Sequence, residues 1–82
     1  MSNSALTALV AMQLKDVPRD MLAAMNNGIQ MYSRISPGNM GYKWALENQL
    51  ITEAGNPTFD LDVTQDAFAY EVLRRAQDGE WD

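Results

Sequence analysis

The sequence predicts an all-α fold, a compact bundle of about four helices with one short extended segment. Apolar residues recur at helical spacing through most of the chain, Pro and Gly cluster between those stretches, and strict alternation occurs only at residues 59–63. The chain has 82 residues, which is enough for one domain with a modest core. We therefore expect a single helical domain over residues 1–77 and a short acidic tail over residues 78–82.

The first helix is expected over residues 5–15, preceded by polar residues 2–4 that can cap it. Its large apolar residues point in nearly all directions around the axis: Leu6, Leu9, Val10, Met12 and Leu14. A helix that is apolar all round is either central to a core or covered by something else. Two interpretations follow, a core helix beneath the second helix, or a contact helix shared between the core and a partner.

The second helix, residues 18–35, organises the chain because its apolar residues keep to one side. Asp16 can cap it, Pro18 suits its first turn, and Pro37 ends it. Ala24 and Gly28 lie four residues apart on the apolar side, where small residues let another backbone approach. A break at Asn26–Gly28 is the rival interpretation, since these residues favour turns. A continuous helix is preferred because the apolar pattern stays in phase.

Two further helices and the extended segment complete the prediction. The third helix is expected over residues 40–53, capped by Asn39 and ended by Gly55 and Pro57. Residues 59–63 alternate apolar and acidic, which is typical of a half-buried extended segment. Thr64 is expected to cap the last helix, residues 65–77.

The last helix is expected to bury one apolar face and to carry one favourable ion pair. The residues of that face are Phe68, Ala69, Val72, Leu73 and Ala76. Glu71 and Arg75 are four residues apart, a spacing that supports an ion pair along a helix.

Composition excludes several kinds of chemistry. The chain contains no Cys and no His, which removes disulfides, thiolate nucleophiles, imidazole catalysis and the usual zinc sites. Neither a phosphate-binding Gly-rich loop nor a G-x-S-x-G motif occurs. We therefore expect no enzyme activity and no cofactor. No stretch reaches the roughly 20 apolar residues of a membrane helix, so a cytoplasmic protein that does not contact membranes is expected.

Charge is unevenly distributed along the chain, whose net charge is −5. Residues 1–46 carry four basic and two acidic side chains, and residues 47–82 carry two basic and nine acidic ones. An acidic half repels phosphate backbones and favours basic protein surfaces. Direct nucleic-acid binding is therefore not expected. A helix-turn-helix with residues 40–53 as its reading helix stays open as a further alternative.

One group of residues resembles a metal-binding pattern. Asp60, Asp62, Thr64, Asp66 and Glu71 have the spacing of the ligands in an EF-hand calcium loop. Gln65 stands where that loop needs Gly, and Gly55 and Pro57 interrupt the helix that should precede it. We expect no bound metal, and these residues form only a weak calcium-site candidate.

The function predicted from the sequence is that of a small acidic, non-enzymatic interaction module. It would act as a regulator that binds another macromolecule and modulates it, with inhibition as one form of this action. The residues expected to contact the partner are Leu6, Leu9, Met12 and Trp81, because Met-rich and Trp-bearing surfaces are common at binding sites. The alternative is a structural subunit of a homo-oligomer or larger assembly, in which the first helix packs against its copy.

Overall fold

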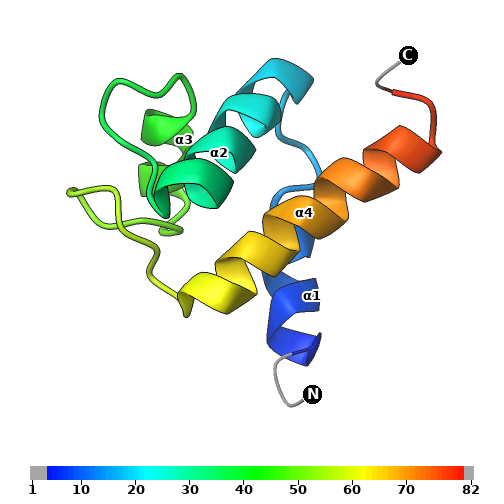
Figure 1. Ribbon diagram of the computed structural model, residues 1–82, viewed down its shortest axis with the longest axis horizontal. Coiled ribbons are helices and arrows are strands. Elements are labelled where there is room, and N and C mark those ends of the chain that lie inside the picture. The colour runs from blue at the N-terminus through cyan, green and yellow to red at the C-terminus, as the bar shows by residue number, and fades with distance from the viewer. Residues whose placement is uncertain (1–3, 81–82) are drawn as a thin grey trace.

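Helix α4 (Leu61–Gln77) is the longest element, and it packs against both α1 (Ser4–Gln13) and α2 (Arg19–Tyr32). Figure 1 shows this computed structural model, which describes residues 4–80, with the short α3 (Tyr42–Glu47) beside α2. The all-α prediction is confirmed. In the described part of the chain, no helix is both long enough and apolar enough to cross a membrane.

Hydrogen bonds fix α2 and α4 in an antiparallel arrangement. Gln30 Nε2 donates to the carbonyl oxygen of Gln65 at 2.8 Å, and Gln65 Nε2 donates to that of Ile29 at 3.2 Å. At the other end, Arg19 Nη1 donates to the carbonyl oxygen of Glu80 at 2.6 Å. The start of α2 therefore lies beside the end of α4, and residues of the expected acidic tail contact the helical domain.

The core lies where α1, α2 and α4 meet. Its fully buried large side chains come from all parts of the chain: Val10, Leu14, Leu22, Met25, Ile29, Ile35, Leu50, Val63 and Phe68. Burying an aliphatic or aromatic side chain contributes about 2 kcal/mol each, so this cluster is the main source of stability.

Helix α2 is continuous through Asn26–Gly28, as preferred, but it ends at Tyr32 rather than Ile35. A Cβ on Gly28 would lie 2.7 Å from the carbonyl oxygen of Arg34, and Asn39 Nδ2 donates to the carbonyl oxygen of Ala24 at 2.8 Å. As predicted, the small residues of α2 allow another part of the backbone, the segment that follows the helix, to approach closely. The expected cap at Asp16 is wrong, since Pro18 occupies the N-cap position and makes no side-chain cap bond.

The third helix is much shorter than the predicted 40–53 and spans only Tyr42–Glu47. Gln49 has a positive φ of 61°, which turns the chain out of helical geometry. The chain then bends back through an isolated bridge between Ile51 and Pro57, with Gly55 at φ 93°. Leu50 and Ile51, at the start of this turn, are both buried in the core.

The predicted extended segment 59–63 is wrong, because α4 begins at Leu61. Thr64 is not a cap but lies within the helix, where its hydroxyl donates to the carbonyl oxygen of Asp60 at 3.0 Å. Acidic residues are favourable in a first helical turn, so Asp62 fits a helix start as well as it fits an alternating strand. An alternating pattern of only five residues does not distinguish an extended segment from the start of a helix.

Candidate interaction surface

Helix α1 is buried on one side and exposed on the other. Val10, Ala11 and Leu14 belong to the core, whereas Leu9 is 57% exposed and Met12 is 68% exposed. The core interpretation holds for one side of this helix, and contact of the other side with a partner stays a prediction. Of the other predicted contact residues, Leu6 is half-buried against the core, and Trp81 lies outside the described residues.

A groove runs between the exposed side of α1 and helix α4. We call it the α1–α4 groove, and the residues that line it are Ala8, Ala11, Met12, Lys15, Tyr70, Glu71 and Arg74. Tyr70 is 58% exposed, and Leu73, three residues further along the same helix, is 57% exposed. We call Leu9, Met12, Tyr70 and Leu73 the α1–α4 face.

Sequence reasoning missed the α4 half of this face. Leu73 and Ala69 were expected in the core, yet both are exposed. The buried side of α4 is instead made by Val63, Thr64, Ala67, Phe68, Glu71 and Arg75. The prediction placed only apolar residues on the buried side of α4, but the ion pair Glu71–Arg75 is buried there as well. The side that faces the core is therefore a different one from the predicted side. No role was assigned to Tyr70 from the sequence. Its only signal in the sequence is that a large side chain stands next to the residues of the predicted apolar face of the last helix.

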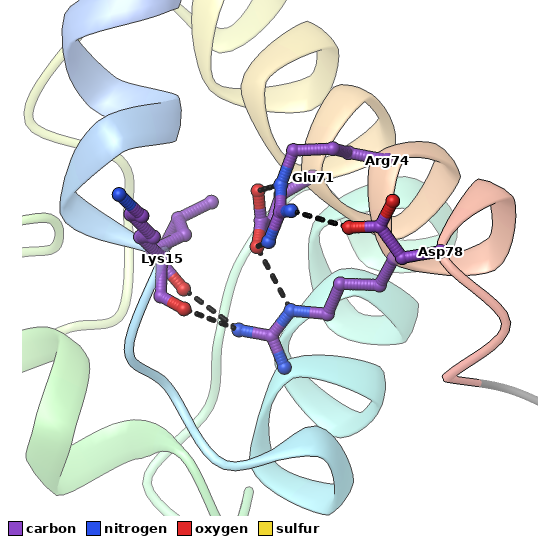
Figure 2. Close-up of polar contacts among 6 residues, drawn as sticks. Lys15, Glu71, Arg74 and Asp78 are labelled. Carbon is purple, nitrogen blue, oxygen red and sulfur yellow. Dashed lines mark hydrogen bonds and ion pairs between the residues drawn. The ribbon is translucent and has the colours of Figure 1, made fainter.

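The floor of the groove is held by an ion-pair network on α4 (Figure 2). The predicted Glu71–Arg75 pair is confirmed, with 2.8 Å between Arg75 Nε and Glu71 Oε2. Arg74 donates to both Glu71 oxygens at 2.9 Å and to Asp78 Oδ2 at 2.9 Å. The Glu71 and Arg75 side chains are only 3% and 4% exposed.

Arg75 also joins α4 to α1. Its Nη2 donates to the carbonyl oxygen of Leu14 at 2.9 Å and to that of Lys15 at 3.2 Å. These carbonyls follow the last turn of α1, where backbone oxygens lack helical partners. The guanidinium therefore fixes the position of α1, and with it the shape of the groove.

The network keeps Glu71 ionised. The hydrogen bonds from Arg74, followed by those from Arg75, hold the pKa of the Glu71 carboxyl below its ordinary value, although burial opposes the shift. The same bonds with Glu71 raise the pKa of Arg74. A carboxylate whose two oxygens both accept hydrogen bonds from Arg is poorly suited to proton transfer.

The network also determines which charged side chains of α4 are left unpaired by a neighbour of opposite sign. Arg74 and Arg75 are the only basic side chains in residues 47–82, and both are engaged by Glu71. The acidic side chains Asp62 and Asp66, by contrast, are exposed on the outer side of α4. Free acidic charge on α4 therefore lies on its outer side, at Asp62 and Asp66, whereas the basic charges of the helix are paired.

The calcium-loop candidate is not supported by this geometry. Asp62, Thr64, Asp66 and Glu71 lie on one helix rather than around a loop, and Asp60 directly precedes it. Glu71 is already bound by two Arg side chains. Across residues 4–80, no three acidic side chains come together in a way that could hold a metal ion.

The helix-turn-helix alternative also lacks its geometry. Residues 33–41 separate α2 from α3, whereas a helix-turn-helix uses a turn of about 3–4 residues. Helix α3 itself spans six residues, which leaves less than two turns to enter a groove of DNA.

Comparison with known proteins assigns neither a family nor a function to this chain. Neither family models of known proteins, nor curated sequences, nor solved structures match this chain.

Proposed function

We propose that this chain is a small, non-enzymatic interaction module that binds another protein chain through its α1–α4 face. The observation that carries the proposal is that two large and exposed apolar side chains, Met12 and Tyr70, line one groove between helices that pack against each other. Contiguous exposed apolar surface is uncommon on monomeric proteins and marks interaction sites. Tyr and Met are also enriched in protein interfaces.

Two features support binding rather than catalysis. The chain lacks the residue types that most often transfer protons or attack substrates, His and Cys. The most buried carboxylate, Glu71, is neutralised by Arg74 and Arg75 and cannot act as an accessible base. We propose that the protein is cytoplasmic and regulates its partner by occupying part of the partner's surface.

The rigidity of the face also supports the proposal. Arg75 fixes the end of α1 against α4, so Met12 and Tyr70 are held on opposite walls of one groove. A surface that is already ordered loses little conformational entropy when it binds.

A site-specific photo-cross-linking experiment tests the proposal. A benzophenone side chain replaces Met12 in one variant and Met31 in another, and the living cells that make the protein are irradiated. Met31 is a matched control because it is 69% exposed on α2, away from the groove. We expect discrete cross-linked products from position 12 and none from position 31. Equal labelling at both positions, or none at either, contradicts the proposal.

A further inference from the structure

Asn27 is followed by Gly28 in the middle of α2, and this pair of residues can react with itself. Of the six asparagines in the chain, only Asn27 stands directly before a glycine. The backbone nitrogen that follows an asparagine can attack the side-chain amide. It does so most readily in glycine, which has no side chain to obstruct the attack. The sequence therefore contains one favoured position for this reaction.

The Asn27 amide is free to react. Its side chain is exposed, and nothing in the part of the chain that the structure describes forms a hydrogen bond with it. The neighbouring Asn26 is different, because its amide oxygen accepts a hydrogen bond from Gln30 Nε2 at 3.2 Å. Asn39 is different as well, since its Nδ2 donates to the carbonyl oxygen of Ala24 at 2.8 Å. Asn27 thus combines a free amide with an unhindered neighbour.

The folded backbone keeps the attacking nitrogen away from that amide. Gly28 is a buried interior residue of α2, so its N–H points along the helix axis toward the carbonyl oxygen four residues earlier. A bond from the Gly28 nitrogen to the Asn27 side chain can form only after this helical hydrogen bond breaks and residue 27 leaves helical geometry.

We propose that Asn27 is a site of spontaneous deamidation, which α2 keeps closed in the folded protein and which becomes reactive when α2 opens. In the reaction, the Gly28 nitrogen bonds to Asn27 Cγ and the bond between Cγ and Nδ2 breaks. Ammonia leaves with the proton of the Gly28 nitrogen, and a cyclic imide remains. Water then opens the imide at either of its two carbonyls, which gives aspartate or isoaspartate at position 27.

Packing rather than local preference holds α2 closed at this point. Gly and Asn are poor helix formers, and Asn26, Asn27 and Gly28 follow one another directly. Met25 and Ile29, on either side of them, are fully buried in the core. Conditions that loosen the core therefore open this part of α2 and release the Gly28 nitrogen.

The isoaspartate product does not fit the closed helix. Isoaspartate carries the main chain through its side chain, which inserts one methylene group directly before Gly28. Even an added Cβ on Gly28 would lie 2.7 Å from the carbonyl oxygen of Arg34, so a shifted backbone has no room there. Because water does not restore the amide, the modification permanently marks chains that have spent time open.

The experiment follows each asparagine of the purified chain by mass spectrometry of protease fragments, since conversion of an amide to an acid raises the fragment mass. The chain is incubated at one pH and temperature, either folded in buffer or unfolded in guanidinium chloride. In the unfolded chain, Asn27 should convert faster than any other asparagine. In buffer, it should convert at least about tenfold more slowly, because the reaction needs the open helix.

An internal reference and two matched variants accompany this measurement. Asn56 precedes Pro57, whose nitrogen has no proton to release, so it should form no imide in either state. Leu22→Ala removes a fully buried side chain of α2, and Leu73→Ala removes an exposed one of α4. At a guanidinium chloride concentration where the parent chain is still folded, Leu22→Ala should convert Asn27 at least about tenfold faster than the parent, whereas Leu73→Ala should match it.

The modified chain gives a separate test of closure. The isoaspartate form, isolated by chromatography, should melt below an Asn27→Asp variant, which has the same charge without the added methylene group. Equal melting temperatures would contradict the misfit at Gly28.

Three other outcomes overturn the proposal. Equal Asn27 rates in buffer and in guanidinium chloride mean that α2 gives no protection. Faster conversion of another asparagine in the unfolded chain means that Gly28 does not select the site. Equal rates in the Leu22→Ala and Leu73→Ala variants mean that opening of the helix does not control the reaction.

Discussion

Arg75 and Glu71 form a buried ion pair, with 2.8 Å between Nε and Oε2. A second guanidinium nitrogen, Nη2, donates to the carbonyl oxygen of Leu14, 61 positions away in the chain. One side chain therefore neutralises a buried carboxylate and bonds to the backbone that directly follows another helix. Because the contact joins the first and last helices, its loss should affect the whole domain.

Replacing Arg75 by Met should lower the free energy of unfolding by about 3 kcal/mol, since it leaves Glu71 with a single partner and the Leu14 carbonyl with none from Arg75. Urea unfolding followed by circular dichroism measures the loss. Arg74→Met is the control, because its side chain is 35% exposed, so its removal should cost clearly less than the loss of Arg75. Equal losses for the two variants would contradict the structural role given to Arg75.

Glu71 should make stability depend on pH. Its folded-state pKa lies below the ordinary value of 4.5, so the unfolded state takes up a proton first as pH falls. The ionised Glu71 carboxylate contributes fully to the free energy of unfolding at pH values above the ordinary pKa of 4.5. This contribution is lost as the pH falls through the lower, folded-state pKa. The stability difference between the parent chain and Glu71→Gln should therefore narrow from about pH 6 to pH 3. Urea titrations at several pH values test this, and a constant difference would argue against it.

Gly28→Ala should destabilise the protein by about 1–2 kcal/mol, even though Ala is the better helix former. The added Cβ would lie 2.7 Å from the carbonyl oxygen of Arg34, a backbone atom that cannot move aside cheaply. Gly38→Ala is the matched control, because no atom lies within 4 Å of its Cβ position. Melting temperatures of the two variants should separate clearly, and a stabilised Gly28→Ala variant would refute the close approach.

The double variant Leu9→Asp, Met12→Asp should stay folded, with a change in unfolding free energy below about 1 kcal/mol. Both side chains are more than half exposed, so charge at these positions remains in water. Leu14→Ala, at the fully buried residue directly after α1, should cost about 3 kcal/mol in the same urea assay. Unfolding of the double variant would mean that these residues support the core rather than the face.

Calcium should leave the thermal stability unchanged, because Asp62, Asp66 and Glu71 are spread along one helix. A ligand that binds only the folded state raises its stability, so melts with added calcium and with chelator are a direct measure. A clear rise in melting temperature with calcium would restore the metal-site candidate.

Local pattern alone determined the all-α class, the continuity of α2 through Asn26–Gly28, and the Glu71–Arg75 pair. Each depends on spacings of three or four residues, which a helix converts directly into neighbouring positions. The small residues Ala24 and Gly28 likewise indicated that another backbone segment approaches α2 closely, although the sequence does not indicate which segment. The exposed Leu9 and Met12 were among the residues expected to contact a partner.

Tertiary structure decided what depends on contacts between distant residues. The Leu14–Arg75 hydrogen bond turns Arg75 inward and Leu73 outward, and no local spacing on α4 indicates which of them faces the core. Burial of Leu50 and Ile51 likewise ends the third helix early, against its local helical pattern. The α1–α4 groove exists only because segments about sixty residues apart in sequence pack together, and packing of that kind is set by the whole core rather than by any one stretch.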